Sequence, residues 1–349
     1  MRLLRARPKL VAALAVLALF VAGAAYQALL GSRTSVGLHV EGNRLVDRGH
    51  DVRLLGVDWS GTERACAEGT GFVGGRTDRA AIRAMVGWRI NTVRIPLNED
   101  CWLAPDGPTT GAPYRRAIES FVERLHAAGL YVILDLRRGE QPMADRARSP
   151  RFWREVADAF RDDRRVLFDL YDEPHEVDWF CWRDGCTHPS GGLRVAGMQQ
   201  LIDAVREAGA KQPIMVGGLD FANDLGRWLD LPPFDPESQL VASFHTDDRS
   251  RCSTERCWDE VIAPVARRVP VVTGELGETD CGTRFVDRFM RWADEHDVSY
   301  LGTAWQPAPC TSPSLIKDYT GRPTPYGAGL KRHLEALWRA KQDVRLGGA

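Results

Sequence analysis

Eight short apolar segments recur along the chain after residue 35, and longer amphipathic segments separate them. Each short segment is rich in apolar and β-branched residues, the pattern of strands buried on both faces of a parallel sheet. In order, they are LLGVD from Leu54, TVRI from Thr92, YVILDL from Tyr131, VLFDLY from Val166, PIMV from Pro213, VASF from Val241, VVTG from Val271 and YLGTA from Tyr300. This repetition constrains the fold more than any other feature of the sequence.

Amphipathic helices are predicted between these segments. Apolar residues recur there at positions i, i+3, i+4 and i+7, as in Ile118, Phe121, Val122 and Leu125, which places them on one face of a helix. No linker or change of composition divides the repeats. The pattern predicts a single-domain α/β protein, a (β/α)8 TIM barrel over residues 35–349. A doubly wound open sheet is the alternative.

The first 34 residues differ in character from the rest. Arg2, Arg5 and Arg7 carry positive charges, whereas residues 10–30 carry none. An uncharged segment of this kind can cross a bilayer core, which takes about 20 residues. We therefore expect residues 1–34 to be a cleaved signal peptide or an uncleaved membrane anchor, with a buried core helix as the alternative. The rest of the chain is then extracytoplasmic, secreted or anchored, and contacts a membrane only through this segment.

The eight cysteines fall in close pairs along the chain. In an exported protein this arrangement predicts disulfides rather than free thiols. Neighbouring cysteines are expected to pair, as Cys66–Cys101, Cys181–Cys186, Cys252–Cys257 and Cys281–Cys310. Eight cysteines allow 105 connectivities, and a zinc site built from the two C-x4-C pairs is a further alternative.

The charge composition narrows the possible partners. There are 46 Lys and Arg residues and 47 Asp and Glu residues, for a formal net charge of -1. This leaves no basic field for a nucleic acid and no acidic excess for a cationic partner. We expect no nucleic-acid partner, no cofactor and no metal, and the sequence does not indicate an oligomeric state.

Polar residues that follow the apolar segments are the candidates for an active site, because a (β/α)8 barrel places its active site at the C-terminal ends of the strands. They are Asp58, Trp59, Ser60, Arg94, Asp135, Arg137, Asp172, Glu173, His175, His245, Asp247, Glu275 and Trp305. Two glutamates facing each other at the mouth predict acid-catalysed cleavage of an acetal, and retaining glycosidases hold such a pair about 5 to 5.5 Å apart. Tryptophan rings stack on sugar rings, so Trp59 and Trp305 are expected to contact substrate, although tryptophans more often fill the core.

The motifs LLGVDWSGTERAC, INTVRIPLNEDCWL, YVILDLR, VLFDLYDEPH, PIMVGGLDFANDL, ASFHT, VPVVTGELGE and AWQP follow one another along the chain. Over residues 38–335 the chain resembles glycoside hydrolase family 5, the cellulase-like family of (β/α)8 retaining enzymes. It looks most like the secreted actinobacterial and fungal members with paired cysteines. The resemblance implies an endoglucanase-like O-glycosyl hydrolase with a carbohydrate substrate, a glucan by default.

The resemblance also implies roles for particular residues. Glu173, after the fourth strand, matches the family's general acid/base, and Glu275, on the seventh strand, matches its nucleophile. Arg94 matches the arginine beside the nucleophile, and His245 matches the histidine after the sixth strand. Trp305 matches the tryptophan beneath the sugar whose bond is cleaved.

Three positions depart from the family pattern. Asp172 stands where the family has an asparagine that donates a hydrogen bond to the sugar 2-hydroxyl, Arg137 where it usually has histidine, and Asp247 where it has tyrosine. An ionised carboxylate cannot donate, so the activity is expected to be altered or reduced. Arg137 is expected to pair with Asp172 or Asp247, and all three to contact substrate. A non-catalytic glycan-binding protein and a structural envelope protein are the alternatives.

Overall fold

The computed structural model describes residues 37–347, with the exception of 138, 140 and 189–191. The predicted signal or anchor, residues 1–34, lies outside the described residues. In the described part of the chain, no helix combines the length and the apolar character needed to cross a membrane.

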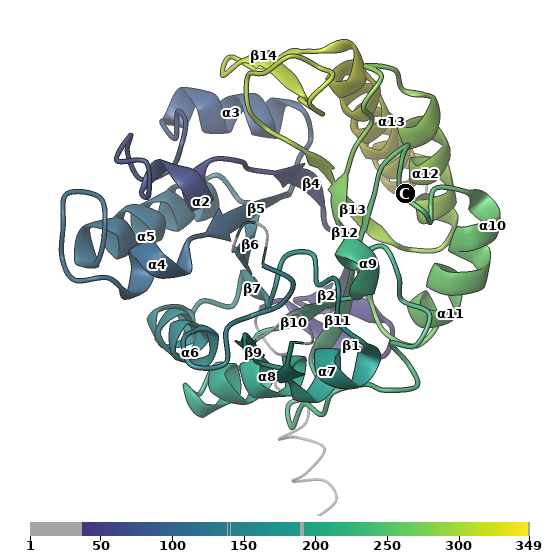
Figure 1. The fold of residues 1–349 in the computed structure, drawn as a ribbon. Helices are drawn as coiled ribbons and strands as arrows, with labels where there is room; N and C mark the ends of the chain where they lie inside the picture. The colour runs from purple at the N-terminus through teal and green to yellow at the C-terminus, as the bar shows by residue number, and fades with distance from the viewer. Residues whose placement is uncertain (1–36, 138, 140, 189–191, 348–349) are drawn as a thin grey trace, which may run out of the picture.

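The eight predicted segments form one closed barrel of parallel strands (Figure 1). The strands are β4 (Leu55–Asp58), β5 (Thr92–Leu97), β6 (Tyr131–Leu136), β7 (Val166–Asp169), β10 (Ile214–Gly217), β11 (Leu240–Thr246), β12 (Val271–Leu276) and β13 (Ser299–Thr303). β13 pairs with β4 and closes the ring, with Tyr300 opposite Leu55, which excludes the open sheet. Every residue of β5 and β7 is buried, as expected for strands covered on both faces.

Helices lie around the barrel, with the short α9 (Leu219–Ala222) over its mouth (Figure 1). They are α2 (Thr62–Ala65), α3 (Arg79–Gly87), α4 (Glu99–Leu103), α5 (Ala112–Ala127), α6 (Ser149–Phe160), α7 (Trp179–Asp184), α8 (Met198–Glu207), α9 (Leu219–Ala222), α10 (Glu255–Cys257), the π-helix η1 (Trp258–Ile262), α11 (Ala263–Ala266), α12 (Arg284–Glu295) and α13 (Pro325–Gly347). α5 is the helix predicted around Ile118, and it buries that side chain. The connection from β10 to β11 departs from the strand–helix pattern, because it holds only the short α9 and fills the core with Leu225 and Trp228 instead.

A small antiparallel sheet covers the end of the barrel at which the strands begin. It consists of β1 (His39–Glu41), β2 (Arg44–Asp47) and β3 (His50–Val52). Leu45 of β2 packs with an apolar layer inside the barrel, and the Leu38 amide donates 2.9 Å to the carbonyl of Arg164, just before β7. The chain therefore enters the fold at this end. Two further pairs of short strands lie outside the barrel, β8 (Cys186–Thr187) with β9 (Arg194–Val195), and β14 (Ile316–Asp318) with β15 (Arg322–Pro323).

All eight cysteines form disulfides, and the predicted pairing is confirmed. The Cα atoms are 6.2 Å apart in Cys66–Cys101, 5.1 Å in Cys181–Cys186, 5.4 Å in Cys252–Cys257 and 5.1 Å in Cys281–Cys310. The two C-x4-C pairs are thus disulfides and not a zinc site. Each of the four bridges lies in segments that follow the C-terminal ends of barrel strands, so all of them brace the mouth of the barrel.

Candidate active site

A fully buried arginine on β5, Arg94, organises the mouth of the barrel. Its guanidinium lies within ion-pair distance of five carboxylates carried by the β4, β6, β7 and β12 segments. The nitrogen-to-oxygen distances are 3.2 Å to Asp58, 3.1 Å to Asp135, 3.1 Å to Asp169, 2.8 Å to Asp172 and 3.1 Å to Glu275. The expected contact between Arg94 and Glu275 is therefore present.

A second guanidinium, that of Arg137 after β6, lies next to the first. Its Nε is 2.7 Å from Oδ2 of Asp172, and its Nη2 is 3.3 Å from Oε1 of Glu275. Because β6 and β7 are neighbours in the barrel, the residues that follow them meet. Of the two partners expected for Arg137, the structure selects Asp172. Asp247 instead accepts hydrogen bonds within its own loop, from the Arg249 amide and the Ser250 hydroxyl.

The charges of these groups depend strongly on one another. Burial on its own would raise the pKa of Asp172, but Arg137 and Arg94 outweigh it and hold that pKa at about 2. Burial raises the pKa of the Asp58 carboxyl, even though Arg94 opposes it. Burial has the same effect on Asp135 and Asp169. The two arginines thus hold Asp172 ionised, whereas burial shifts the pKa values of the deeper carboxyls upward.

Glu173 lies at the end of the β7 segment, where its backbone has a φ of 56°. Its Oε1 is 3.3 Å from Nδ1 of His245, which follows from the predicted position of both residues at strand ends. Burial raises the pKa of Glu173, and the charges of Asp172 and Glu275 raise it further. Of these causes, burial contributes most to the shift. For His245, burial would lower the pKa, but the hydrogen bond with Glu173 and the charge of Glu275 raise it.

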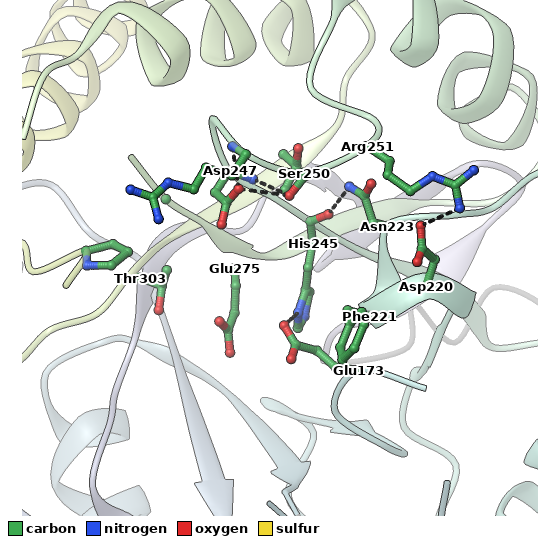
Figure 2. A pocket seen from close by; sticks show the side chains of 14 residues that line it. Glu173, Asp220, Phe221, Asn223, His245, Asp247, Ser250, Arg251, Glu275 and Thr303 are labelled. Carbon is green, nitrogen blue, oxygen red and sulfur yellow. Dashed lines mark hydrogen bonds and ion pairs between the residues drawn. The ribbon is translucent and has the colours of Figure 1, made fainter. Parts of the chain in front are cut away.

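A cavity of about 380 Å³ opens at this point, and both glutamates line it. Figure 2 shows the side chains of Glu173 and Glu275 directed toward the same space, with His245 between them. The Glu173 side chain is 32% exposed and that of Glu275 is 14% exposed, so both reach the opening. A carboxyl with a raised pKa and a carboxylate paired with two guanidinium groups therefore face one cavity, which suits general acid catalysis combined with nucleophilic attack.

The wall of the cavity on the β10 side comes from an unusual turn. Asp220, Phe221 and Ala222 all have φ between 56° and 60°, in the left-handed region. This turn exposes half of the Phe221 side chain and stacks its ring on His175, with centroids 4.3 Å apart. Phe221 is thus an aromatic surface at the mouth that the sequence did not reveal, because nothing in PIMVGGLDFANDL signals a left-handed turn.

The two tryptophans expected to contact substrate do not line the cavity. Trp305 is fully buried, with its ring edge-on to Trp88 at 4.9 Å between centroids. Trp59 is also fully buried, its indole N–H donates 2.7 Å to the carbonyl of Val73, and its ring stacks on Tyr319. The chain after β4 folds back over Trp59, and a neighbouring ring covers an edge of Trp305. In this structure, neither indole offers an open face to a sugar.

Asp172, His245 and Glu275 also bring three possible ligand atoms within 4.8 Å of one another. The two carboxylates already pair with Arg94 and Arg137, so a cation would have to displace guanidinium groups.

Asp169, the remaining member of the Arg94 cluster, was not among the sequence candidates. It is the one polar residue within an otherwise apolar run, VLFDLY, and that interruption is the signal that could have identified it.

Comparison with known proteins agrees with the geometry. The family described as Cellulase (glycosyl hydrolase family 5) matches residues 49–309. The chain is 23% identical to Endoglucanase MaCel5A of Microbulbifer sp. (strain ALW1) over 303 residues, which are 79% of this chain and 54% of that protein. It is 26% identical to Endo-beta-1,4-glucanase B of Emericella nidulans over 257 residues, covering 65% of this chain and 73% of the relative. The chain thus spans about half the length of the first relative.

Solved structures share the fold. The crystal structure of the β-glucanase SdGluc5_26A from Saccharophagus degradans in complex with cellotetraose superimposes with a TM-score of 0.68 and 20% sequence identity. The match covers 87% of this chain and 94% of that one. The (β/α)8 prediction is confirmed.

Proposed function

The chain belongs to the cellulase family, glycosyl hydrolase family 5, and from this membership we propose that it is a retaining β-glycosidase that hydrolyses a β-linked glucan. The observation that carries the proposal is that Glu173 and Glu275 line the same cavity in different charge environments. Distant relatives named as endoglucanases, and a β-glucanase bound to cellotetraose, support the choice of glucan.

In the proposed reaction, Glu275 attacks the anomeric carbon of the sugar and forms a glycosyl ester. The bond to the leaving oxygen breaks, and that oxygen takes the proton of Glu173, whose raised pKa keeps the proton available. Glu173 then removes a proton from water, the water oxygen bonds to the anomeric carbon, and the ester bond to Glu275 breaks. Two inversions give net retention of configuration.

The surrounding residues hold these two groups in place. Arg94 and Arg137 contact Glu275 and balance its charge, and His245 contacts Glu173 through Nδ1. The exposed ring of Phe221 gives a sugar an apolar surface beside Glu173. No step needs a cofactor or a metal.

We also propose that the protein acts outside the cytoplasm. Four disulfides brace the mouth, and such bonds persist in oxidising compartments. The export signal or anchor predicted for residues 1–34 fits this location, with residues 35–349 as the catalytic unit.

The test uses the full chain and an activated aryl β-cellobioside. Glu275→Ala is expected to lower kcat by about 10⁴-fold or more, because it removes the group that forms the covalent bond. Glu173→Ala is also expected to be slow on cellulose oligomers, and added azide should partly restore its turnover of the aryl substrate with retained configuration, followed by NMR. Glu207→Ala, which removes a glutamate from the outer surface of α8, is the matched control and should keep wild-type kinetics.

Hydrolysis and binding are measured separately on arrayed β-glycosides. A product of inverted configuration would rule out double displacement. Binding of oligosaccharides without hydrolysis would support the non-catalytic alternative, and a lack of both would contradict the proposal for any glycan.

A further inference from the structure

Retaining glycosidases stabilise the transition state with hydrogen bonds to the 2-hydroxyl of the sugar whose bond is cleaved. A donor for that hydroxyl has to lie beside the nucleophile. Asp172 lies beside the nucleophile, with a carboxylate oxygen within 4.8 Å of one on Glu275, but its pKa of about 2 means that it is an ionised carboxylate, which only accepts hydrogen bonds. A different side chain must donate.

The hydrogen-bond donors around Glu275 differ in their exposure and in whether their N–H groups already have partners. Arg94 is fully buried, and its Nε and both terminal nitrogens face carboxylates. His245 is also buried, and its Nδ1 already lies against Glu173. Among the described residues that contact Glu275, Arg137 is the one with substantial exposure, at 25% of its side chain.

Arg137 also occupies the right place along the mouth. Its Nη2 is 3.3 Å from Oε1 of Glu275, which lines the cavity, and Arg137 itself lines an adjoining hollow of about 600 Å³ together with Ser60 and Asn98. A sugar bonded to Glu275 and extending toward that hollow would pass the guanidinium. A guanidinium carries five N–H donors in a planar fork, so contacts with Asp172 and Glu275 leave donors for a hydroxyl.

We propose that Arg137 donates the hydrogen bond to the 2-hydroxyl of the sugar at the cleaved bond, and that Asp172 is a positioning residue that holds Arg137 in place. Nε of Arg137 is fixed by Oδ2 of Asp172 at 2.7 Å, while Oδ1 of Asp172 is fixed by Arg94 at 2.8 Å. The buried arginine thereby orients the exposed one through a shared carboxylate. This inference rests on the proposed glycosidase function and names the substrate group that one residue of that site contacts.

The experiment compares two substrates in each variant. One is 2,4-dinitrophenyl β-cellobioside, and the other lacks the 2-hydroxyl on the ring bonded to dinitrophenol. We expect Arg137→Met to lower kcat/KM for the parent substrate more than for the deoxy analogue, by a factor of roughly 10 to 150, the factor for one hydrogen bond from a charged donor. Arg137→Lys, which keeps a charged donor without the fork, is expected to lose part of that selectivity.

Arg64→Met is the matched control, because Arg64 is an exposed arginine on the same hollow and pairs with Glu63. Its ratio of kcat/KM for the two substrates should equal that of the wild type. Melting temperatures verify folding, and if Arg137→Met does not fold, Arg137→Lys carries the comparison.

Equal losses on both substrates would overturn the inference, since they would show that Arg137 only supports the site. A gain of activity in Arg137→Met would also overturn it, because Arg137 would then obstruct the sugar. Wild-type protein that hydrolyses neither substrate would refute the proposed function itself, and the role of Arg137 with it.

Discussion

The two ends of this barrel are built from opposite chemistry. At the end where the strands begin, an apolar layer fills the interior, and β1–β3 cover it. Its members are Leu38, Leu45, Leu54, Ile133, Leu167, Met215, Val241, Val272 and Leu301. At the mouth, the same strands bury Arg94 among carboxylates, and four disulfides tie the surrounding segments together.

The difference shows how the fold combines stability with chemistry. Each side chain buried in the apolar layer, at the end where the strands begin, stabilises the fold by about 1.5–3 kcal/mol. Burial of the charges at the mouth costs free energy that only close ion pairs offset. Disulfides lower the entropy of the unfolded chain, and here all of them lie at the end that gains least from burial.

The largest effect is expected when the cation at the mouth is removed. Arg94→Met leaves its carboxylates without their shared partner, which should destabilise the protein by about 3–5 kcal/mol and greatly reduce kcat/KM. Leu167→Ala, in the apolar layer, should lower the free energy of unfolding by a similar 2–5 kcal/mol but leave the kcat/KM of the folded protein unchanged. Urea unfolding and kinetics measure both. If Leu167→Ala reduced kcat/KM as much as Arg94→Met, the contrast between an end that only stabilises the fold and an end that also supports catalysis would be wrong.

A smaller effect is expected from opening the disulfides at the mouth. In the chain-entropy model, replacing Cys281 and Cys310 by serine, which opens a 29-residue separation, should cost about 3–4 kcal/mol. The same change at Cys252 and Cys257, five residues apart, should cost about 2 kcal/mol. Melting temperatures and urea titrations test this order. Equal costs for both bridges would show that native-state contacts, and not loop length, set their contribution.

The smallest effect is expected on the pH profile. In the proposed reaction Glu173 donates a proton, so activity is expected to fall as pH rises through its raised pKa. Asp172→Asn removes one of the charges that raise this pKa, and the alkaline limb of kcat/KM should therefore move to lower pH. It should stay above the limb of an ordinary glutamate, because burial remains. Asp220→Asn, which neutralises a carboxylate paired with Arg251 on the same cavity, should leave the limb in place. An upward shift in Asp172→Asn would contradict the electrostatic account.

The sequence predicted the strands and the disulfides because both depend on short-range patterns. A run such as YVILDL has few alternatives to a buried strand, and cysteines close in sequence in an exported chain tend to pair. The contact between Arg137 and Asp172 was also predictable, since both residues follow neighbouring strands.

Sequence patterns did not predict which side chains reach the cavity, because this depends on how the loops pack. Trp59 and Trp305 do follow strand ends, but position along a strand does not decide whether a ring faces the cavity or lies beneath the next segment. Phe221 reaches the cavity only because three successive residues adopt left-handed backbone angles, which no local motif signals. Asp169 was hidden in an apolar run whose other members fill the core.

The hydrogen bond between the Leu38 amide and the Arg164 carbonyl has a practical meaning for handling the protein. Arg164 precedes β7, whereas Glu173 follows it, so the chain joins the fold on the side away from the cavity. A bead, an electrode or a sensor surface coupled through the N-terminal side would hold the barrel with its opening toward the solution. Long, insoluble polymers could then approach the cavity without crossing the support.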